Sequence, residues 1–227
     1  MDPKHRDRIG FLRVCSGHFK KGEKLHHVRS GKDLKISSPM IFQSQDRDIL
    51  EEEAGPGDIV GLPGNFQIGD TLTNGEKIQF TGIPRFAPEL FKKAVLKDPL
   101  KAKHLDKGLR QLSEEGAVQL FTKTVGNDKI LGAVGALQFD VVQYRLENEY
   151  NVRGSYEPLG YQGICWILFP DKKTENNFTA YYPNSILFDR LNNPCFAFNA
   201  SWDLKMAKEK FPDANFYKNS DYTEGHE

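Results

Sequence analysis

Apolar residues at helical spacing stand out near residue 110. Leu105, Leu109 and Leu112 recur at i, i+4 and i+7, a spacing that lines one face of a helix and leaves the other faces polar. Asp98-Pro99 indicates where this helix begins and Gly116 where it ends. An alternating strand pattern follows directly. We therefore expect an amphipathic helix between two strands.

The strand, helix and strand order occurs a second time in the next forty residues. Residues 90–96 form the first expected strand, and a hairpin turn is expected at residues 126–128, where Gly, Asn and Asp tolerate positive φ. A second helix is expected at residues 137–150 and a strand from Val152. The order βαββαβ predicts a split βαβ (ferredoxin-like) sheet over about residues 86–158.

Residues 159–227 are expected to extend this α+β domain. Strands are predicted at residues 164–169, 186–188, 195–198 and 215–218, and the middle two are expected to pair. Ser201 is expected to cap a helix that ends before Pro212. The polar end, residues 221–227, is expected to fray.

The N-terminal part alternates short apolar runs with turn residues at roughly ten-residue spacing, which is typical of a barrel. Strands are expected at residues 9–15, 25–28, 34–36, 41–42, 59–60, 68–72 and 78–80. Closure into a small β-barrel avoids exposed strand edges. A linker containing Pro84 and Pro88 follows, so we predict a β-barrel domain at 1–82 and an α+β domain at 83–227.

Composition fits two ordinary domains. The chain has 227 residues, of which 38% are hydrophobic and 27% charged. No apolar run approaches the length of a membrane helix, so we expect a cytoplasmic protein without a membrane partner. Three cysteines without a C-x-x-C spacing argue against a disulfide framework or a zinc site and favour reduced, buried thiols.

Charge is balanced overall but uneven along the chain. Residues 1–36 hold ten Lys and Arg against four Asp and Glu. A local excess of this kind favours contacts with phosphates. The predicted RNA-binding residues are Arg13, Lys20, Lys21, Lys24, Arg29 and Lys32. Few aromatic residues lie nearby, which favours docking on folded RNA over reading of single-stranded bases. The alternative is a set of solvated barrel loops.

The patterns of catalytic and metal sites are missing from the sequence. There is no G-x-x-x-x-G-K-[ST] and no N-K-x-D, so GTP cannot be held by the usual loops. His26 and His27 are adjacent in a strand and point to opposite faces. Glu114 and Glu115 are expected to be a solvated pair, with Arg110 offsetting part of their charge. We expect this chain to be no enzyme and to hold no metal or cofactor.

Two segments carry a resemblance to a known family. The third domain of ribosome-associated GTPases is similar to the segments GLRQLSEEGAVQ and GAVGALQFDVVQYRLENEYNV. Within them, the motifs SEEGAVQ and LQFDV most resemble the bacterial peptide chain release factor of the GTPase class. MDPKHRDRIGFLRVCSG, PGDIVGL, IGDTLT and FTGIPRFAPELF also resemble this family. The resemblance covers most of residues 1 to 160.

The resemblance implies a ribosomal function. The chain is expected to hold the second and third domains of such a factor without its GTPase domain, so GTP, Mg²⁺ and GTP hydrolysis belong to the full-length protein. The barrel would rest on ribosomal RNA and protein of the small subunit. The whole factor would remove class I release factors after peptide release. A contact with another domain or a ribosomal protein is expected at His104, Lys107, Arg110 and Gln111.

The sequence leaves two alternatives open. One is a translation GTPase similar to elongation factor G, which moves tRNA, although nothing here resembles its fourth and fifth domains. The other is a free-standing RNA or protein interaction module. No feature points to DNA.

Overall fold

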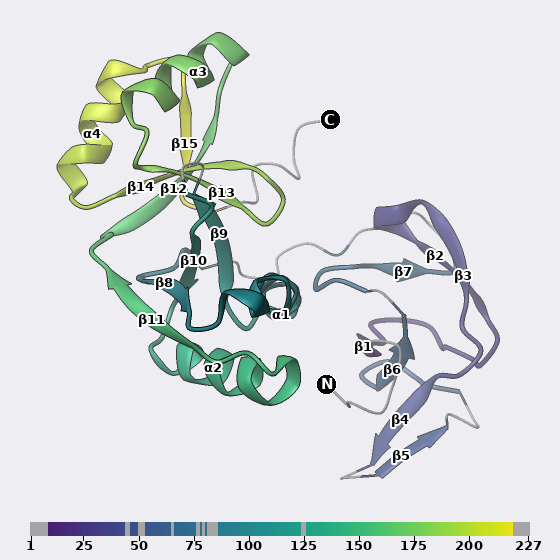
Figure 1. Cartoon of the computed structure of the whole chain (residues 1–227). Helices are drawn as coiled ribbons and strands as arrows, with labels where there is room; N and C mark the ends of the chain where they lie inside the picture. The colour runs from purple at the N-terminus through teal and green to yellow at the C-terminus, as the bar shows by residue number, and fades with distance from the viewer. Residues whose placement is uncertain are drawn as a thin grey trace. The chain divides into compact units, whose positions relative to one another are not determined.

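The structure, a computed structural model, separates into two compact units at residues 1–83 and 84–227, beside the predicted boundary near residue 82 (Figure 1). It describes residues 9–43, 46–49, 53–64, 66–75, 78, 80, 86–123 and 126–219. The expected frayed end, residues 221–227, lies outside the described residues.

The described residues of the first unit form two antiparallel sheets around one core. The four-stranded sheet has the order β1-β6-β4-β5, and the three-stranded sheet has the order β3-β2-β7. The strands are β1 Ile9–Arg13, β2 Lys24–His27, β3 Lys32–Lys35, β4 Met40–Gln43, β5 Asp46–Ile49, β6 Ile59–Pro63 and β7 Leu72–Thr73. A short 3₁₀ helix, η1 Val28–Ser30, joins β2 to β3.

Apolar residues from both sheets of the first unit share that core. Its buried members are Val14, Phe19, Leu25, Ile36, Ala54, Val60 and Leu62. A single bridge between Phe19 and Ala54 lies outside the named strands. The predicted barrel fold class is confirmed, but the described strands form two separate sheets rather than the continuous ring expected of a closed barrel.

In the first unit, two predicted strands differ from the structure and one strand of the structure was not predicted. Residues 68–72 are mostly a turn, because Gly69 has φ +94° and Asp70 N–H donates to the Gln67 carbonyl at 3.1 Å. β5 was not predicted because its sequence, DRDI, is mostly charged. It pairs with β4 alone among the described strands, and such edge strands tolerate charge. Of the strand predicted at residues 78–80, the described residues 78 and 80 have no strand assignment.

The second unit begins with the predicted ferredoxin-like sheet. Its elements are β8 Leu90–Leu96, η2 Pro99–Lys101, α1 Ala102–Glu114, β9 Gln119–Lys123, β10 Lys129–Ala133, α2 Leu137–Tyr150 and β11 Gly154–Leu159. The strands lie in the order β11-β8-β10-β9, all antiparallel. Leu109, Leu112, Phe139 and Val142 pack the helices onto one face of this sheet.

The predicted extension is a second βαββαβ unit. Its elements are β12 Gly163–Leu168, α3 Lys172–Tyr181, β13 Ile186–Asp189, β14 Pro194–Phe198, α4 Ser201–Lys210 and β15 Asn215–Tyr217. The strand order β13-β14-β12-β15 is that of the first repeat, taken from the other end. The pairing predicted between residues 186–188 and 195–198 is confirmed by the antiparallel β13–β14 ladder. α3 was not predicted.

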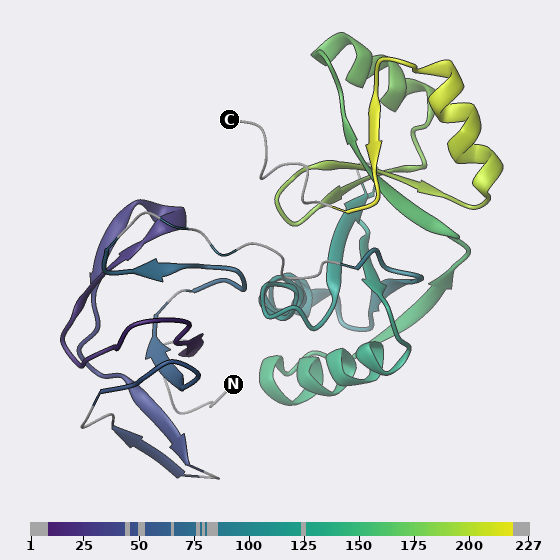
Figure 2. The same ribbon diagram turned by 180° about the vertical axis from the view of Figure 1, so that it is seen from behind.

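The two repeats join through β9 and β13 into one eight-stranded antiparallel sheet. The helix pair α1 and α2 lies at one end of the unit and the pair α3 and α4 at the other, with the sheet between them (Figures 1 and 2). The faces of the two repeats that carry no helices pack against each other. Phe121 of β9 and Trp166 of β12 show this contact: their ring centroids lie 6.0 Å apart, although the two strands are not neighbours in the sheet. Trp166 Nε1 donates to Asp189 Oδ2 at 3.0 Å.

Local sequence signals explain several of the helix ends. Asp98 caps η2 by accepting from Leu100 N–H at 3.0 Å, and Gly116, with φ +74°, closes α1. The cap predicted at Ser201 is wrong: Ala200 holds that position, and the Asp203 carboxylate accepts from its N–H at 2.9 Å.

The thiols divide differently from the sequence prediction. Cys165 and Cys195 are buried as expected, whereas Cys15 is exposed. Cys15 continues the alternation of β1, in which Phe11 and Arg13 are exposed and Val14 is buried, so it lies on the exposed side. Among the helices that the structure describes, none is long and apolar enough to cross a membrane.

Candidate functional site

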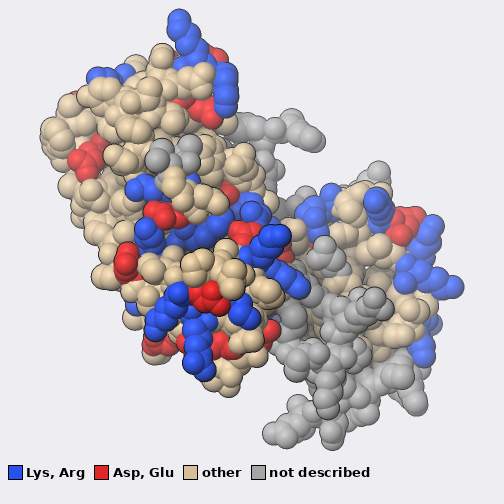
Figure 3. Space-filling model, viewed as in Figure 1, with Lys and Arg blue, Asp and Glu red and all other residues tan. Residues whose placement is uncertain are grey.

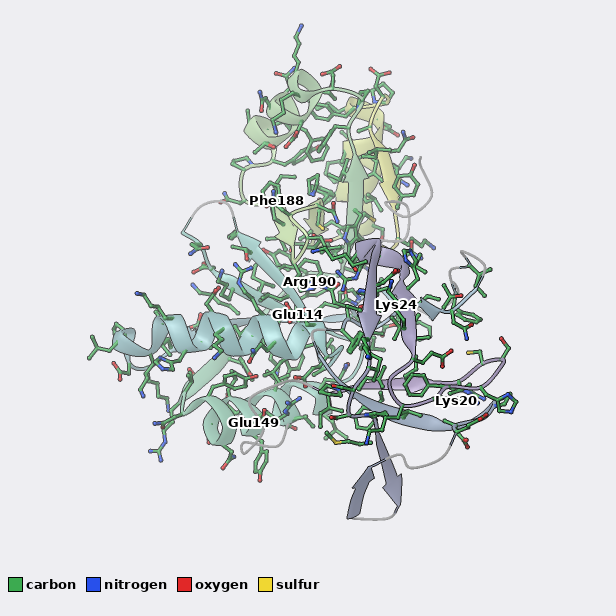
Figure 4. All side chains as sticks on the ribbon, turned by 90° about the vertical axis from the view of Figure 1, so that its right-hand side faces the viewer. Lys20, Lys24, Glu114, Glu149, Phe188 and Arg190 are labelled. Carbon is green, nitrogen blue, oxygen red and sulfur yellow. The ribbon has the colours of Figure 1, made fainter. Side chains whose placement is uncertain are left out.

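Three of the predicted RNA-binding lysines lie in the turn between β1 and β2 and at the first position of β2, and two of them, Lys20 and Lys24, are labelled in Figure 4. Gly22 has φ +81° and allows the tight turn, and Lys20 N–H donates to Glu23 Oε2 at 3.0 Å. The side chain of Lys20 forms an ion pair with Glu53, and this hydrogen bond raises the pKa of Lys20. Lys21 is exposed and has no ion pair with a described residue.

Lys24 and Lys32 stand at opposite ends of the β2–β3 ladder. Lys24 Nζ lies 2.9 Å from Asp33 Oδ2, and His26 Nδ1 lies 2.8 Å from Asp33 Oδ1. The hydrogen bonds from Lys24 and then His26 lower the pKa of Asp33. Lys32, like Arg13 at the end of β1, is exposed and unpaired within the described part of the chain.

Arg29, itself exposed, forms a salt bridge with the buried carboxylate of Asp70. Its Nε and Nη2 donate to Asp70 Oδ1 and Oδ2 at 2.5 and 2.9 Å. Only 6% of the Asp70 side chain is exposed, and its Oδ2 also accepts from Gln67 N–H at 2.8 Å. Burial opposes ionisation, but the hydrogen bond from Arg29 and those from other donors outweigh it and lower the pKa of Asp70. Arg29 therefore ties η1 to the turn before β7.

The four residues predicted on α1 divide into two groups. His104, Lys107 and Arg110 are exposed, whereas Gln111 is half-buried. Gln111 Oε1 accepts from Tyr150 OH at 2.8 Å and so joins α1 to α2. Arg110 Nε donates to Asp106 Oδ2 at 2.9 Å. In the described ranges, His104 and Lys107 have no hydrogen bond or ion pair from their side chains.

Arg145 of α2 supplies the counter-charge for Glu115 that was expected from within α1. Its Nη1 donates to Glu115 Oε2 at 2.6 Å, and its Nε and Nη2 donate to Glu149 at 2.7 and 2.8 Å. These hydrogen bonds, that to Glu149 first, raise the pKa of Arg145. The network is a structural link between α1 and α2.

The buried thiols of the second unit are poorly suited to nucleophilic chemistry. Burial raises the pKa of the Cys165 and Cys195 thiols, which disfavours the nucleophilic thiolate. No group of three or more His, Cys, Asp or Glu within the described residues stands where it could hold a metal ion. The exposed cations are thus the main candidates for function.

Comparisons with known proteins place this chain among translation factors. The model for elongation factor G domain 2 matches residues 1–75. The model for the class II release factor RF3, C-terminal domain, matches residues 80–208, which is more than half of the chain. The chain belongs to the class II release factor RF3 family. This confirms the resemblance identified from the sequence.

A solved structure supports the fold. The crystal structure of a protein from Thermus thermophilus is similar with a TM-score of 0.56 and 22% identity, and the match covers 66% of this chain and 23% of that chain. This chain thus spans less than a quarter of that protein. Neither family match covers a GTP-hydrolysing domain.

Proposed function

We propose that this chain is the ribosome-binding part of a peptide chain release factor that removes class I release factors from the ribosome after peptide release. The match of the RF3 C-terminal model across residues 80–208 carries this proposal. GTP and Mg²⁺ would be bound by a separate GTPase domain of the full-length protein. The factor would act in the cytoplasm, where ribosomes are.

The exposed cations of the first unit would hold the small subunit through RNA phosphates. Lys20 and Lys24 each have an acidic partner, so moving them to a phosphate means breaking an ion pair. Arg13, Lys21 and Lys32 have no such partner among the described residues. We therefore assign the larger share of the RNA contact to Arg13, Lys21 and Lys32.

The face of α1 with His104 and Lys107 would contact another domain or a ribosomal protein. Both side chains are exposed on the helix, and the buried leucines fix which way the helix faces. Gln111 would contribute indirectly, by holding α1 against α2.

The test is a recycling assay with a class II GTPase domain joined ahead of this chain. We expect faster release of a fluorescent class I factor from terminated ribosomes. Lys21→Ala with Lys32→Ala should weaken ribosome binding and flatten its dependence on salt, because fewer counterions are released from RNA. Lys173→Ala with Lys205→Ala, on exposed helix positions of the second unit, is the matched control.

A second candidate, tRNA movement, is favoured by the match of elongation factor G domain 2 to residues 1–75. Translocation of tRNA by the same fusion, with class I factors left bound, would replace the release-factor proposal by this one.

A further inference from the structure

The joint between the two repeats places one cation, one hydroxyl and one aromatic ring side by side. In the sheet register, Thr122 of β9 lies opposite Lys129 of β10 on one side and Phe188 of β13 on the other. Residues directly opposite one another share a face of the sheet. Leu120, two residues before Thr122, lies on the same face, which is the face that α1 covers.

These residues line a pocket of about 270 Å³ at the edge of α1. Four cations line it, and each comes from a different element or turn: Arg110, Lys123, Lys129 and Arg190. Asp189 is the one acidic side chain among the lining residues. Figure 3 shows Lys and Arg side chains gathered across the middle of the second unit, between its two helix pairs.

The charges of the pocket are only partly neutralised. Asp106 accepts from Arg110 and lies 3.0 Å from Lys129 Nζ, so it offsets part of their charge. The oxygens of Asp189 are occupied by four donors from Trp166, Leu191 and Asn193. Lys123 and Arg190 form no ion pair with a described residue.

The aromatic floor distinguishes this pocket from a simple basic patch. Phe188, labelled with Arg190 in Figure 4, is half-buried: it packs against the aromatic core of the second repeat and also lines the pocket. Unpaired RNA bases stack on aromatic rings while Arg side chains bind the adjoining phosphates. An acidic peptide would use the cations but would have no need of the ring.

We propose that this pocket binds one unstacked nucleotide of single-stranded RNA, with the base against Phe188 and the phosphate between Arg110 and Arg190. The proposal deepens the proposed function, since the RNA met by a ribosome-binding factor is ribosomal. It adds a base-stacking site in the second unit to the phosphate contacts of the first.

The experiment measures binding of the 227-residue chain to a fluorescent single-stranded RNA octamer and to the same octamer as a duplex, at several salt concentrations. Arg190→Ala should lower the slope of log K against log salt by about 0.7, the value for one phosphate on a single strand. Phe188→Leu should weaken single-strand binding by at least about fivefold and spare the duplex. Lys173→Ala removes the same charge from α3 and should change neither quantity.

Equal binding by the Arg190 and Lys173 variants would overturn the proposal. If deca-glutamate binds in an Arg190-dependent way and RNA does not, the occupant is an acidic protein segment. Should Phe188→Leu fail to fold, a 4-thiouridine octamer crosslinked to the wild-type chain replaces it. A crosslink on the peptide containing Phe188 supports the site, and crosslinks confined to residues 1–83 contradict it. None of these measurements uses the ribosome, so the RNA-binding pocket and the proposed recycling function can each fail without the other.

Discussion

The two βαββαβ repeats of the second unit share one strand order and hold their helices by different means. In the first repeat α1 and α2 pack on each other, and Arg145 of α2 links them through its ion pair with Glu115, the C-cap residue of α1. In the second, α3 and α4 enclose a cluster of aromatic rings. The same topology is therefore compatible with two kinds of core, so element order alone does not dictate which side chains stabilise it.

The first repeat depends on close contact between helices. Gly108 permits it, because an added Cβ would lie only 2.7 Å from Leu146 Cδ2 and 3.0 Å from Tyr150 Cγ. Leu109 and Leu112, both fully buried, continue the contact along α1. Aliphatic packing and the ion pairs together fix the pair of helices.

The second repeat depends on Phe178 of α3. Its ring is fully buried, and five other rings lie with centroids 4.8 to 5.9 Å from it. These rings are Phe169, Tyr182, Phe196, Phe211 and Phe216. One side chain thus connects both helices with strands of the sheet.

The largest expected effect is that of Phe178→Ala. We expect it to lower the free energy of unfolding of the second repeat by about 3 to 5 kcal/mol, the cost of removing a buried aromatic ring and leaving a cavity. Both tryptophans of the chain, Trp166 and Trp202, lie in the second repeat. Tryptophan fluorescence during urea unfolding therefore reports this region.

Tyr181→Ala, three positions later on α3, is the control. The Tyr181 side chain is half-exposed, and Lys210 Nζ lies 3.5 Å from its ring centroid. Loss of that cation–π contact should cost no more than about 1 kcal/mol. Equal urea midpoints for Phe178→Ala and Tyr181→Ala would show that Phe178 is not the main stabilising residue of the second core.

The contrast between the repeats also explains what the sequence could predict. Leucines at helical spacing indicated α1, but α3 has Phe178 as its one buried residue and therefore no periodic pattern. The sequence pattern of the second repeat therefore predicts only an extension with four strands and one helix. Its four strands were found because each is a short run of apolar or β-branched residues bounded by turns.

The candidate sites were predicted unevenly for a related reason. Basic residues close together in sequence were easily grouped, but the salt bridge of Arg29 joins it to Asp70, 41 residues later. The pocket brings Arg110 beside Arg190, which is 80 positions later in the numbering, through the pairing of β9 with β13. Contacts of this kind follow from strand order, which the sequence pattern does not reveal.

The second prediction concerns the ion pairs of the first repeat. Arg145→Met keeps most of the aliphatic side chain and removes the hydrogen bonds to Glu115 and Glu149. We expect a loss of about 2 kcal/mol, in the range for hydrogen bonds to charged groups at a largely buried site. Lys172→Met is the control, since its pair with Glu175 in α3 is exposed and should contribute less than about 0.5 kcal/mol.

The pH dependence gives this prediction a sign. The hydrogen bond from Arg145 lowers the pKa of Glu149 in the folded protein. The stabilisation is therefore present above the usual Glu pKa of 4.5 and is lost as pH falls through the lower folded value. The difference in stability between wild type and Arg145→Met should therefore disappear at acid pH, as measured by hydrogen exchange of the α2 amides. A constant difference down to acid pH would show that packing, not charge, holds the helices.

The smallest expected effect tests how α3 forms without a periodic apolar face. Asp171 Oδ1 accepts from Thr174 N–H at 2.7 Å, and this backbone hydrogen bond lowers the pKa of Asp171. Asp171→Ala should lower the urea midpoint of the second repeat by the amount typical of a lost N-cap, whereas Asp171→Asn keeps the acceptor and should lower that midpoint clearly less. Ser201→Ala is the matched change at the start of α4 and should have almost no effect, because Asp203 provides the hydrogen bonds there. Urea unfolding followed by tryptophan fluorescence measures all three. If the Ala and Asn variants at position 171 were equally destabilised, the negative charge at the start of α3, rather than the capping hydrogen bond, would be what stabilises this helix beside Phe178.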